Sequence, residues 1–139
     1  MRTGFIDSAI LLKNSCLKME EDILNRFNIS PSEYKGLLVI DEGEILSGKV
    51  YSARMDLSIS RGSRIIEHLV KNGYLKHEDC SDDRRCNKVS LTAKGIKLRK
   101  EIYKLLDECE EELLSVIPEN ELVSLKSIIN KFTNILNSK

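Results

Sequence analysis

The chain of 139 residues lacks any long apolar run. No run is longer than four residues, as at residues 37–40, whereas a helix that spans a bilayer needs about 20. The start of the chain, with Arg2 followed by Asp7, also lacks the apolar segment of a targeting signal. We therefore expect a cytoplasmic protein that does not enter a membrane and keeps its four cysteines reduced.

The sequence also lacks the signatures of catalysis. It contains neither a glycine-rich phosphate loop nor a pair of carboxylates in a plausible pocket. The nearest approach to a reactive cluster is His77, Cys80 and Cys86, on a segment with nothing to exclude water. Zinc sites usually have four ligands in tighter pairs, so these residues do not predict a metal site. We predict no enzymatic activity and no cofactor.

The chain carries no net charge, because 22 Lys and Arg balance 22 Asp and Glu. Neutrality alone argues against a nucleic-acid partner, since affinity for DNA depends on neutralising phosphates. The distribution is uneven, however. Residues 47–104 hold 14 Lys and Arg against 7 Asp and Glu, and the remainder holds 8 against 15. A basic middle between acidic ends favours a polyanionic partner for the middle.

Apolar residues with a helical period predict helices towards both ends of the chain. Residues 5–27 keep this period without glycine or proline, and residues 93–116 form a second long pattern. Pro118 then starts a last helix with an apolar stripe. Cys16 and Cys109 fall on apolar faces of these helices and are predicted to be core residues. The stripes indicate either packing against a second copy or completion of a monomeric core.

A shorter helix is predicted after the first. Ser30, Pro31 and Glu33 have the spacing of a helix cap, a first helical residue and a capping box. This helix is expected to end near Gly43, and residues 45 and 46 are expected to add a short strand.

Residues 47–95 have the pattern of two short helices followed by a β-hairpin. Ser47 caps the first of these helices, which stops at residues 56–58. After a turn at residues 58–60, residues 61–72 form the second, which ends at Gly73. Two alternating segments joined by a charged loop lead to Thr92, which caps the next helix. This order is that of a winged helix-turn-helix and predicts sequence-specific binding to duplex DNA.

Polar side chains of the helix over residues 61–72 cluster in its first two turns. They are Arg61, Ser63, Arg64 and His68, whereas the apolar residues would face the core. A recognition helix reads base edges with its N-terminal residues, and arginine can bind guanine with two hydrogen bonds. The alternative is an ordinary solvated helix face, and the hairpin that follows favours the reading helix.

Four local motifs occur in the order and spacing of one known family. They are a supporting helix over residues 47–58, a helix ending in Leu69-Val70-Lys71-Asn72-Gly73-Tyr74, the triplet Asp83-Arg84-Arg85 and the segment Leu91-Thr92-Ala93-Lys94-Gly95. With the order of elements, they make nearly the whole chain resemble the MarR family of bacterial transcriptional regulators. The chain departs from that pattern at Gly62, where the family often has a larger residue, and at Ser52, which replaces a small alanine.

The resemblance implies a mainly α-helical fold with a small β-hairpin wing, in a single winged-helix domain over residues 1–139. Residues 30–92 would form the DNA-binding winged helix-turn-helix, and residues 1–28 and 93–139 the flanking dimerisation helices. Contacts with bases in the major groove, and with the backbone beside it, are implied for Ser58, Ser60, Arg61, Ser63 and Arg64. Arg85 would enter the minor groove, and Asp83 would hold Arg85 or a neighbouring backbone group in place. Phosphate contacts are implied for Lys76, Arg84 and Lys88.

The implied function is that of a homodimeric regulator of transcription, a repressor released by a small molecule or a redox signal. Its partners would be a pseudo-palindromic duplex operator, a second copy of the chain and a small-molecule effector. The alternative is a winged-helix module that binds other proteins and no longer binds DNA.

Two sites could receive the signal that releases the repressor. The resemblance implies an effector cavity, and the cysteines suggest a redox site on the wing. An effector cavity would be lined by Ile10, Lys13, Tyr34, Leu37 and Leu38, with Lys13 facing a carboxylate; a core with a snorkelling lysine explains these residues equally well. A disulfide between Cys80 and Cys86 would reshape the wing, although the aspartates beside them oppose thiolate formation.

Overall fold

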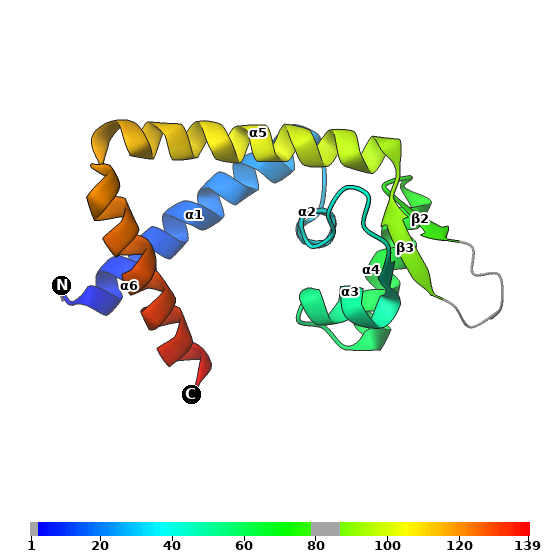
Figure 1. Ribbon diagram of the computed structural model, residues 1–139, viewed down its shortest axis with the longest axis horizontal. Coiled ribbons are helices and arrows are strands. Elements are labelled where there is room, and N and C mark those ends of the chain that lie inside the picture. The colour runs from blue at the N-terminus through cyan, green and yellow to red at the C-terminus, as the bar shows by residue number, and fades with distance from the viewer. Residues whose placement is uncertain (1–2, 79–86) are drawn as a thin grey trace. The chain divides into compact units, whose positions relative to one another are not determined.

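The computed structural model describes residues 3–78 and 87–139. In chain order they form α1 (Phe5–Phe27), α2 (Pro31–Leu38), β1 (Leu46–Ser47), α3 (Gly48–Arg54), α4 (Ile59–Lys71), β2 (Leu75–Glu78), β3 (Lys88–Leu91), α5 (Ala93–Val116) and α6 (Glu119–Asn137) (Figure 1). The fold is mainly α-helical with one small sheet, which confirms the predicted fold class. The chain divides into two compact units, the first ending at Ile102 and the second formed by Tyr103–Lys139.

Helices α2, α3 and α5 begin where local sequence signals predict. Ser30 Oγ accepts the backbone N–H of Glu33 at 3.1 Å, and the Glu33 carboxylate accepts that of Ser30 at 3.2 Å. Ser47 and Thr92 each accept the N–H of the third residue that follows, at 3.2 and 3.1 Å. These bonds satisfy backbone donors that the first turn of a helix leaves unpaired.

Two predicted helix boundaries are wrong. Helix α2 ends at Leu38, five residues before Gly43, because the Arg54 guanidinium binds the Val39 carbonyl at 2.9 Å and Ile40 enters the core from a loop. Helix α4 begins at Ile59, two residues before the predicted start at Arg61, because Ser58 is its cap. The Ser58 hydroxyl accepts the backbone N–H of Arg61 at 3.2 Å, so the predicted turn at residues 58–60 is the helix start.

The sheet has three antiparallel strands in the order β1-β3-β2. Leu46 pairs with Val89, and Leu75 pairs with Leu91. All four of these side chains are buried, so one face of the sheet closes the core of the first unit. The short β1 confirms the strand predicted around residues 45 and 46, and β2 and β3 form the predicted wing hairpin.

Tyr51 lies at the centre of this core with its side chain fully buried. Its hydroxyl donates to the Gly36 carbonyl at 2.7 Å, which joins α3 to α2. A Cβ at Gly36 would lie 2.5 Å from that hydroxyl, so the approach of the two helices requires glycine there. Burial raises the pKa of Tyr51, which remains a neutral hydrogen-bond donor.

We call residues 30–78 and 87–92 the winged segment. Helix α6 differs from this segment because none of the residues of α6 is buried within the chain. In α1, only Ile23 is buried. The prediction that Cys16 is a core residue is wrong for the single chain: it is exposed, and Cys109 is half-buried. A helical period identifies an apolar face but does not identify what covers it. Among residues 3–78 and 87–139, none of the helices combines the length and apolar composition that a bilayer crossing requires.

Candidate nucleic-acid interface

The first two turns of α4 present a polar, basic surface. Ser58, Ser60, Arg61 and Arg64 are exposed, and Ser63 is half-buried. The buried residues of the helix are Gly62, Ile66 and Leu69, at the spacing of one helical face. Neither guanidinium forms an ion pair within residues 3–78 and 87–139, so both are free to bind an external acceptor.

Contact between Gly62 and Ser52 fixes how α4 lies on α3. A Cβ at Gly62 would lie 2.5 Å from the Cβ of Ser52 and closer still to its Oγ, while Ser52 itself is 1% exposed. The two departures from the family pattern therefore face each other: Gly62 makes the room that Ser52 needs. Because the side chain at 52 is anchored by its 2.7 Å bond to the Gly48 carbonyl, this contact sets the rotation of α4.

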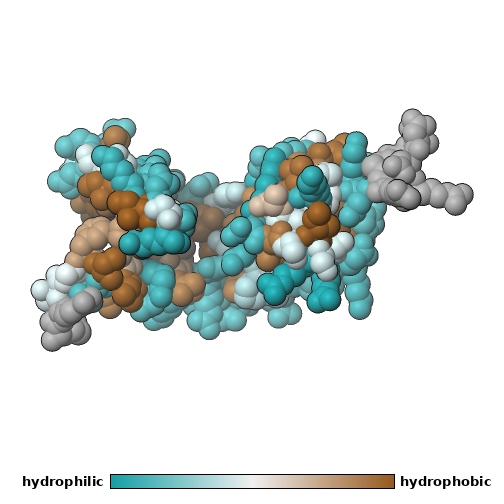
Figure 2. Space-filling model, turned by 90° about the horizontal axis from the view of Figure 1, so that it is seen from below, coloured by the Kyte–Doolittle hydropathy of each residue, from teal (hydrophilic) through white to brown (hydrophobic). Residues whose placement is uncertain are grey.

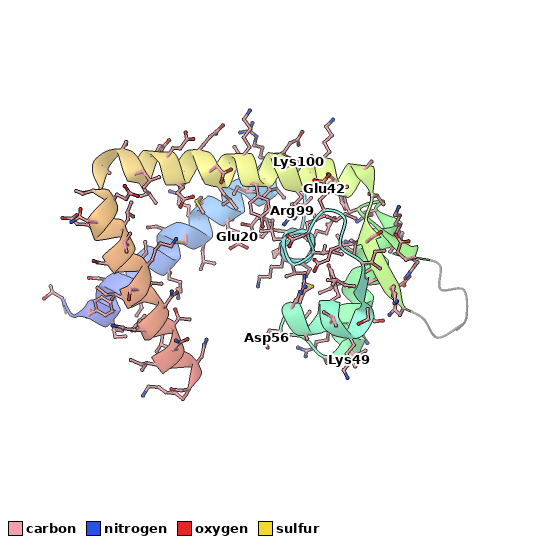
Figure 3. The ribbon with its side chains drawn as sticks, viewed as in Figure 1. Glu20, Glu42, Lys49, Asp56, Arg99 and Lys100 are labelled. Carbon is pink, nitrogen blue, oxygen red and sulfur yellow. The ribbon has the colours of Figure 1, made fainter. Side chains whose placement is uncertain are left out.

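The turn between α3 and α4 is closed by backbone hydrogen bonds. Asp56 has a left-handed conformation (φ 57°), and its N–H donates to the Ala53 carbonyl at 3.0 Å. The N–H of Leu57 donates to the Ser52 carbonyl at 3.0 Å. These bonds complete a helix C-cap of the Schellman kind and fix the angle at which the chain enters α4. Figure 3 labels Asp56 in this turn and Lys49 on α3.

The described part of the wing carries exposed basic side chains, and its strand β2 contacts α4. Lys76 on β2 and Lys88 on β3 are both exposed. His77 Nε2 lies 3.0 Å from Glu67 Oε1, which links β2 to α4. The remaining predicted wing residues, Arg84, Arg85, Cys80, Cys86 and Asp83, lie outside the described residues.

The C-terminal end of α4 is held by a buried carboxylate. Glu33, 8% exposed, accepts from Asn72 Nδ2 at 3.3 Å, and its Oε1 lies 3.4 Å from His68 Nε2. Lys94 Nζ donates to the Asn72 carbonyl at 2.8 Å and lies 4.6 Å from the centre of the Tyr74 ring. Burial, and then the Glu33 charge, raise the pKa of Tyr74. The sequence identified Glu33 as a capping residue only, because its long-range partners carry no local signal.

Several basic residues of the middle segment serve internal ion pairs. Arg99 Nη2 lies 2.6 Å from Asp41 Oδ1, and Lys100 Nζ lies 3.4 Å from Glu42 Oε2 (Figure 3). These pairs tie α5 to the loop after α2. Lys49, exposed on α3, forms no ion pair with a described residue and was not among the predicted contacts. Its position two residues after the cap Ser47, in the first turn of α3, is the signal that could have identified it.

The predicted effector residues differ in accessibility. Ile10 and Lys13 on α1 are exposed, and Tyr34 and Leu38 on α2 are half-buried. Leu37 is fully buried and belongs to the core. Lys13 forms no ion pair within the described residues.

The geometry is that of a winged helix-turn-helix whose reading helix carries exposed arginines. No protein-family model matches the chain. It is 30% identical over 138 residues to the HTH-type transcriptional regulator PrsX of Escherichia coli, in an alignment that covers 85% of this chain and 83% of PrsX. It is 25% identical over 136 residues to the transcriptional repressor MprA of E. coli K12, covering 91% and 77%.

Solved structures share the fold at lower identity. The crystal structure of NadR in complex with 4-hydroxyphenylacetate has a TM-score of 0.69 and 22% identity, covering 95% of this chain and 94% of NadR. Wild-type MarR of E. coli in its apo form has a TM-score of 0.70 and 16% identity, covering 95% and 98%. The chain belongs to the MarR family of HTH-type transcriptional regulators. It is a DNA-binding regulator, and its relatives PrsX and MprA are regulators, not enzymes.

Proposed function

We propose that the protein is a homodimeric repressor that places one α4 helix of each subunit in successive major grooves of a pseudo-palindromic operator. The main support for the proposed DNA contacts is the exposure of the Arg61 and Arg64 guanidinium groups. Neither has a counter-ion within residues 3–78 and 87–139. Both come from the N-terminal turns of α4, the part of a recognition helix that reaches base edges.

Phosphate contacts come from the side chains around this helix. Lys76 and Lys88 on the wing and Lys49 on α3 are exposed and basic. They add affinity without reading sequence. By its place in the sequence, Arg84 is a further phosphate contact, and Arg85 is the proposed contact in the adjacent minor groove.

Dimerisation is supported by the apolar faces of α1 and α6. In α6, five large apolar side chains of one face are between 42% and 59% exposed: Leu125, Ile128, Ile129, Ile135 and Leu136. Figure 2 shows apolar side chains, in brown, at the surface of the chain. A second copy covers such faces and separates two reading helices by about 34–36 Å, one turn of duplex.

The repressor role is supported by the relative MprA, which is named a transcriptional repressor. Release by a small molecule is supported by NadR, whose structure contains 4-hydroxyphenylacetate. In this chain, Ile10, Lys13, Tyr34 and Leu38 are the proposed contacts for a small acid, with the Lys13 ammonium facing its carboxylate. Leu37 supports α2 from within the core.

Binding of operator duplexes tests the proposal. Operator fragments are selected from genomic DNA, and affinity is measured by fluorescence anisotropy across a series of salt concentrations. Arg64→Ala is expected to weaken binding about 10- to 100-fold and to relax sequence preference at one position of each half-site. Lys97→Ala removes a positive charge from exposed α5 surface and is the matched control, with little expected effect.

An unchanged affinity and salt dependence in Arg64→Ala and Arg61→Ala would contradict the proposed interface. That result would favour a winged-helix module that binds protein.

A further inference from the structure

One exposed apolar side chain stands at the start of the reading helix. Within the described part of residues 47–104, the exposed large apolar side chains are Val50, at 43%, and Ile59, at 58%. Ile59 is the first residue of α4 and directly follows the cap Ser58.

Packing of the chain does not account for this isoleucine. Ile59 lies one helical turn before Gly62, and residues 62, 66 and 69 continue the same stripe as buried residues. The core ends at Gly62, where α4 meets α3 through Ser52. The stripe therefore extends one turn beyond the core, and an apolar group is left in water beside Ser60 and Arg61, which are also exposed.

We propose that Ile59 determines part of the operator sequence by packing against the 5-methyl group of a thymine. This inference rests on the proposed function, because it requires α4 to enter the major groove. Among the base edges exposed in that groove, thymine presents an apolar methyl group, whereas the other edges offer hydrogen-bond donors and acceptors. Ile59 stands in the first turn of α4, and the N-terminal end of a recognition helix is the part that reaches base edges.

The predicted effect is small and position-specific. Removal of one buried methyl group corresponds to about a fourfold loss of affinity per half-site. Deoxyuridine differs from thymidine by this methyl group alone, so single replacements of thymidine by deoxyuridine in the operator isolate the contact. An apolar contact with the sugar–phosphate backbone would be insensitive to the replacement.

The test combines these duplexes with two protein variants. Affinities of the full chain, Ile59→Ala and Ile45→Ala are measured for the selected operator and for each single deoxyuridine duplex. Ile45 is the matched control, since it is also an isoleucine, 55% exposed, and outside the proposed interface. Because Ile59 is exposed, Ile59→Ala is expected to fold, which circular dichroism checks.

The expected result is one thymine per half-site at which deoxyuridine weakens binding by the full chain and by Ile45→Ala, but not by Ile59→Ala. Sequence-specific binding with no deoxyuridine-sensitive position, or with equal sensitivity in Ile59→Ala, would overturn the role of Ile59 and leave the proposed function standing. Absence of any sequence preference in the full chain would overturn both.

Discussion

The winged segment and helix α6 differ in how far their apolar side chains are buried. In the winged segment, Tyr51, Ile66 and Leu69 are at most 1% exposed. In α6, Ile128 is 49% and Ile135 is 59% exposed, although both belong to the apolar stripe of that helix. The winged segment buries its apolar side chains within one chain, whereas α6 leaves its apolar side chains exposed.

This difference separates two requirements for DNA recognition. The winged segment needs a fixed geometry for α4, which its own core supplies through the contacts of Gly36 with Tyr51 and of Gly62 with Ser52. The terminal helices carry surface whose burial contributes about 1.5–3 kcal/mol for each large apolar side chain. Covering them in a dimer would stabilise association without altering the reading helix.

The largest expected effect is a loss of dimer affinity when the exposed apolar face of α6 receives a charge. Ile128→Glu places a charge on the apolar face of α6, where Ile128 is now 49% exposed. An unpaired charge buried in an interface costs about 3–5 kcal/mol, so we expect dimer affinity to fall at least about a hundredfold. Analytical ultracentrifugation measures this shift, and circular dichroism should show the winged segment still folded.

Asn130→Glu is the matched control for that variant. It adds the same charge to α6, but its position is about 160° around the helix from the apolar stripe's centre. Equal dimer affinities of Ile128→Glu and Asn130→Glu would show that the apolar face of α6 is not the interface.

A smaller effect is expected at the contact between α3 and α4. Gly62→Ala places a methyl group against Ser52, and overpacking of this kind costs about 2 kcal/mol of unfolding free energy. Ser52→Ala in the same chain removes the closest atom and should restore part of the loss, with a coupling of about 1 kcal/mol. Urea unfolding of the two single variants and the double variant measures it. Additive losses would mean that the two side chains do not constrain each other.

Local signals predicted most of the fold, because helix caps depend on residues three positions apart. Ser30, Ser47 and Thr92 each start a helix as predicted. The end of α2 was missed because it depends on Arg54, which lies 15 residues after Val39. The start of α4 was predicted two residues too late, because Ser58 was assigned to a turn although serine also caps helices.

The candidate site was predictable to the extent that helical phase determines exposure. The spacing correctly separated exposed Arg61 and Arg64 from buried Ile66 and Leu69. It did not reveal that Gly62 and Ser52 are in contact, since nothing local links residues ten positions apart. Whether the exposed residues touch DNA stays a prediction, as does any role of Arg84 and Arg85.

The smallest expected effect is a loss of stability of the winged segment in acid, because the ion pair of Glu44 and Arg54 depends on pH. Hydrogen bonds from the Arg54 guanidinium, at 2.6 and 2.8 Å, and from the Asp41 backbone lower the pKa of Glu44 from 4.5 to about 2. Since the folded-state pKa is the lower one, the pair stabilises the fold above about pH 4.5 and loses this effect as pH falls towards 2. The pair is at the surface, so the effect is modest.

Thermal unfolding between pH 6 and pH 2.5 measures the effect of this pair, the range being about that over which the carboxylate titrates. The midpoint of the unaltered chain should fall more steeply with acid than that of Glu44→Gln, which has no carboxylate to protonate. Glu101→Gln, at an exposed position of α5, controls for the removal of a carboxylate and should keep the steep dependence. Parallel curves for Glu44→Gln and the unaltered chain would mean that the pair of Glu44 and Arg54 does not set the response of the winged segment to acid.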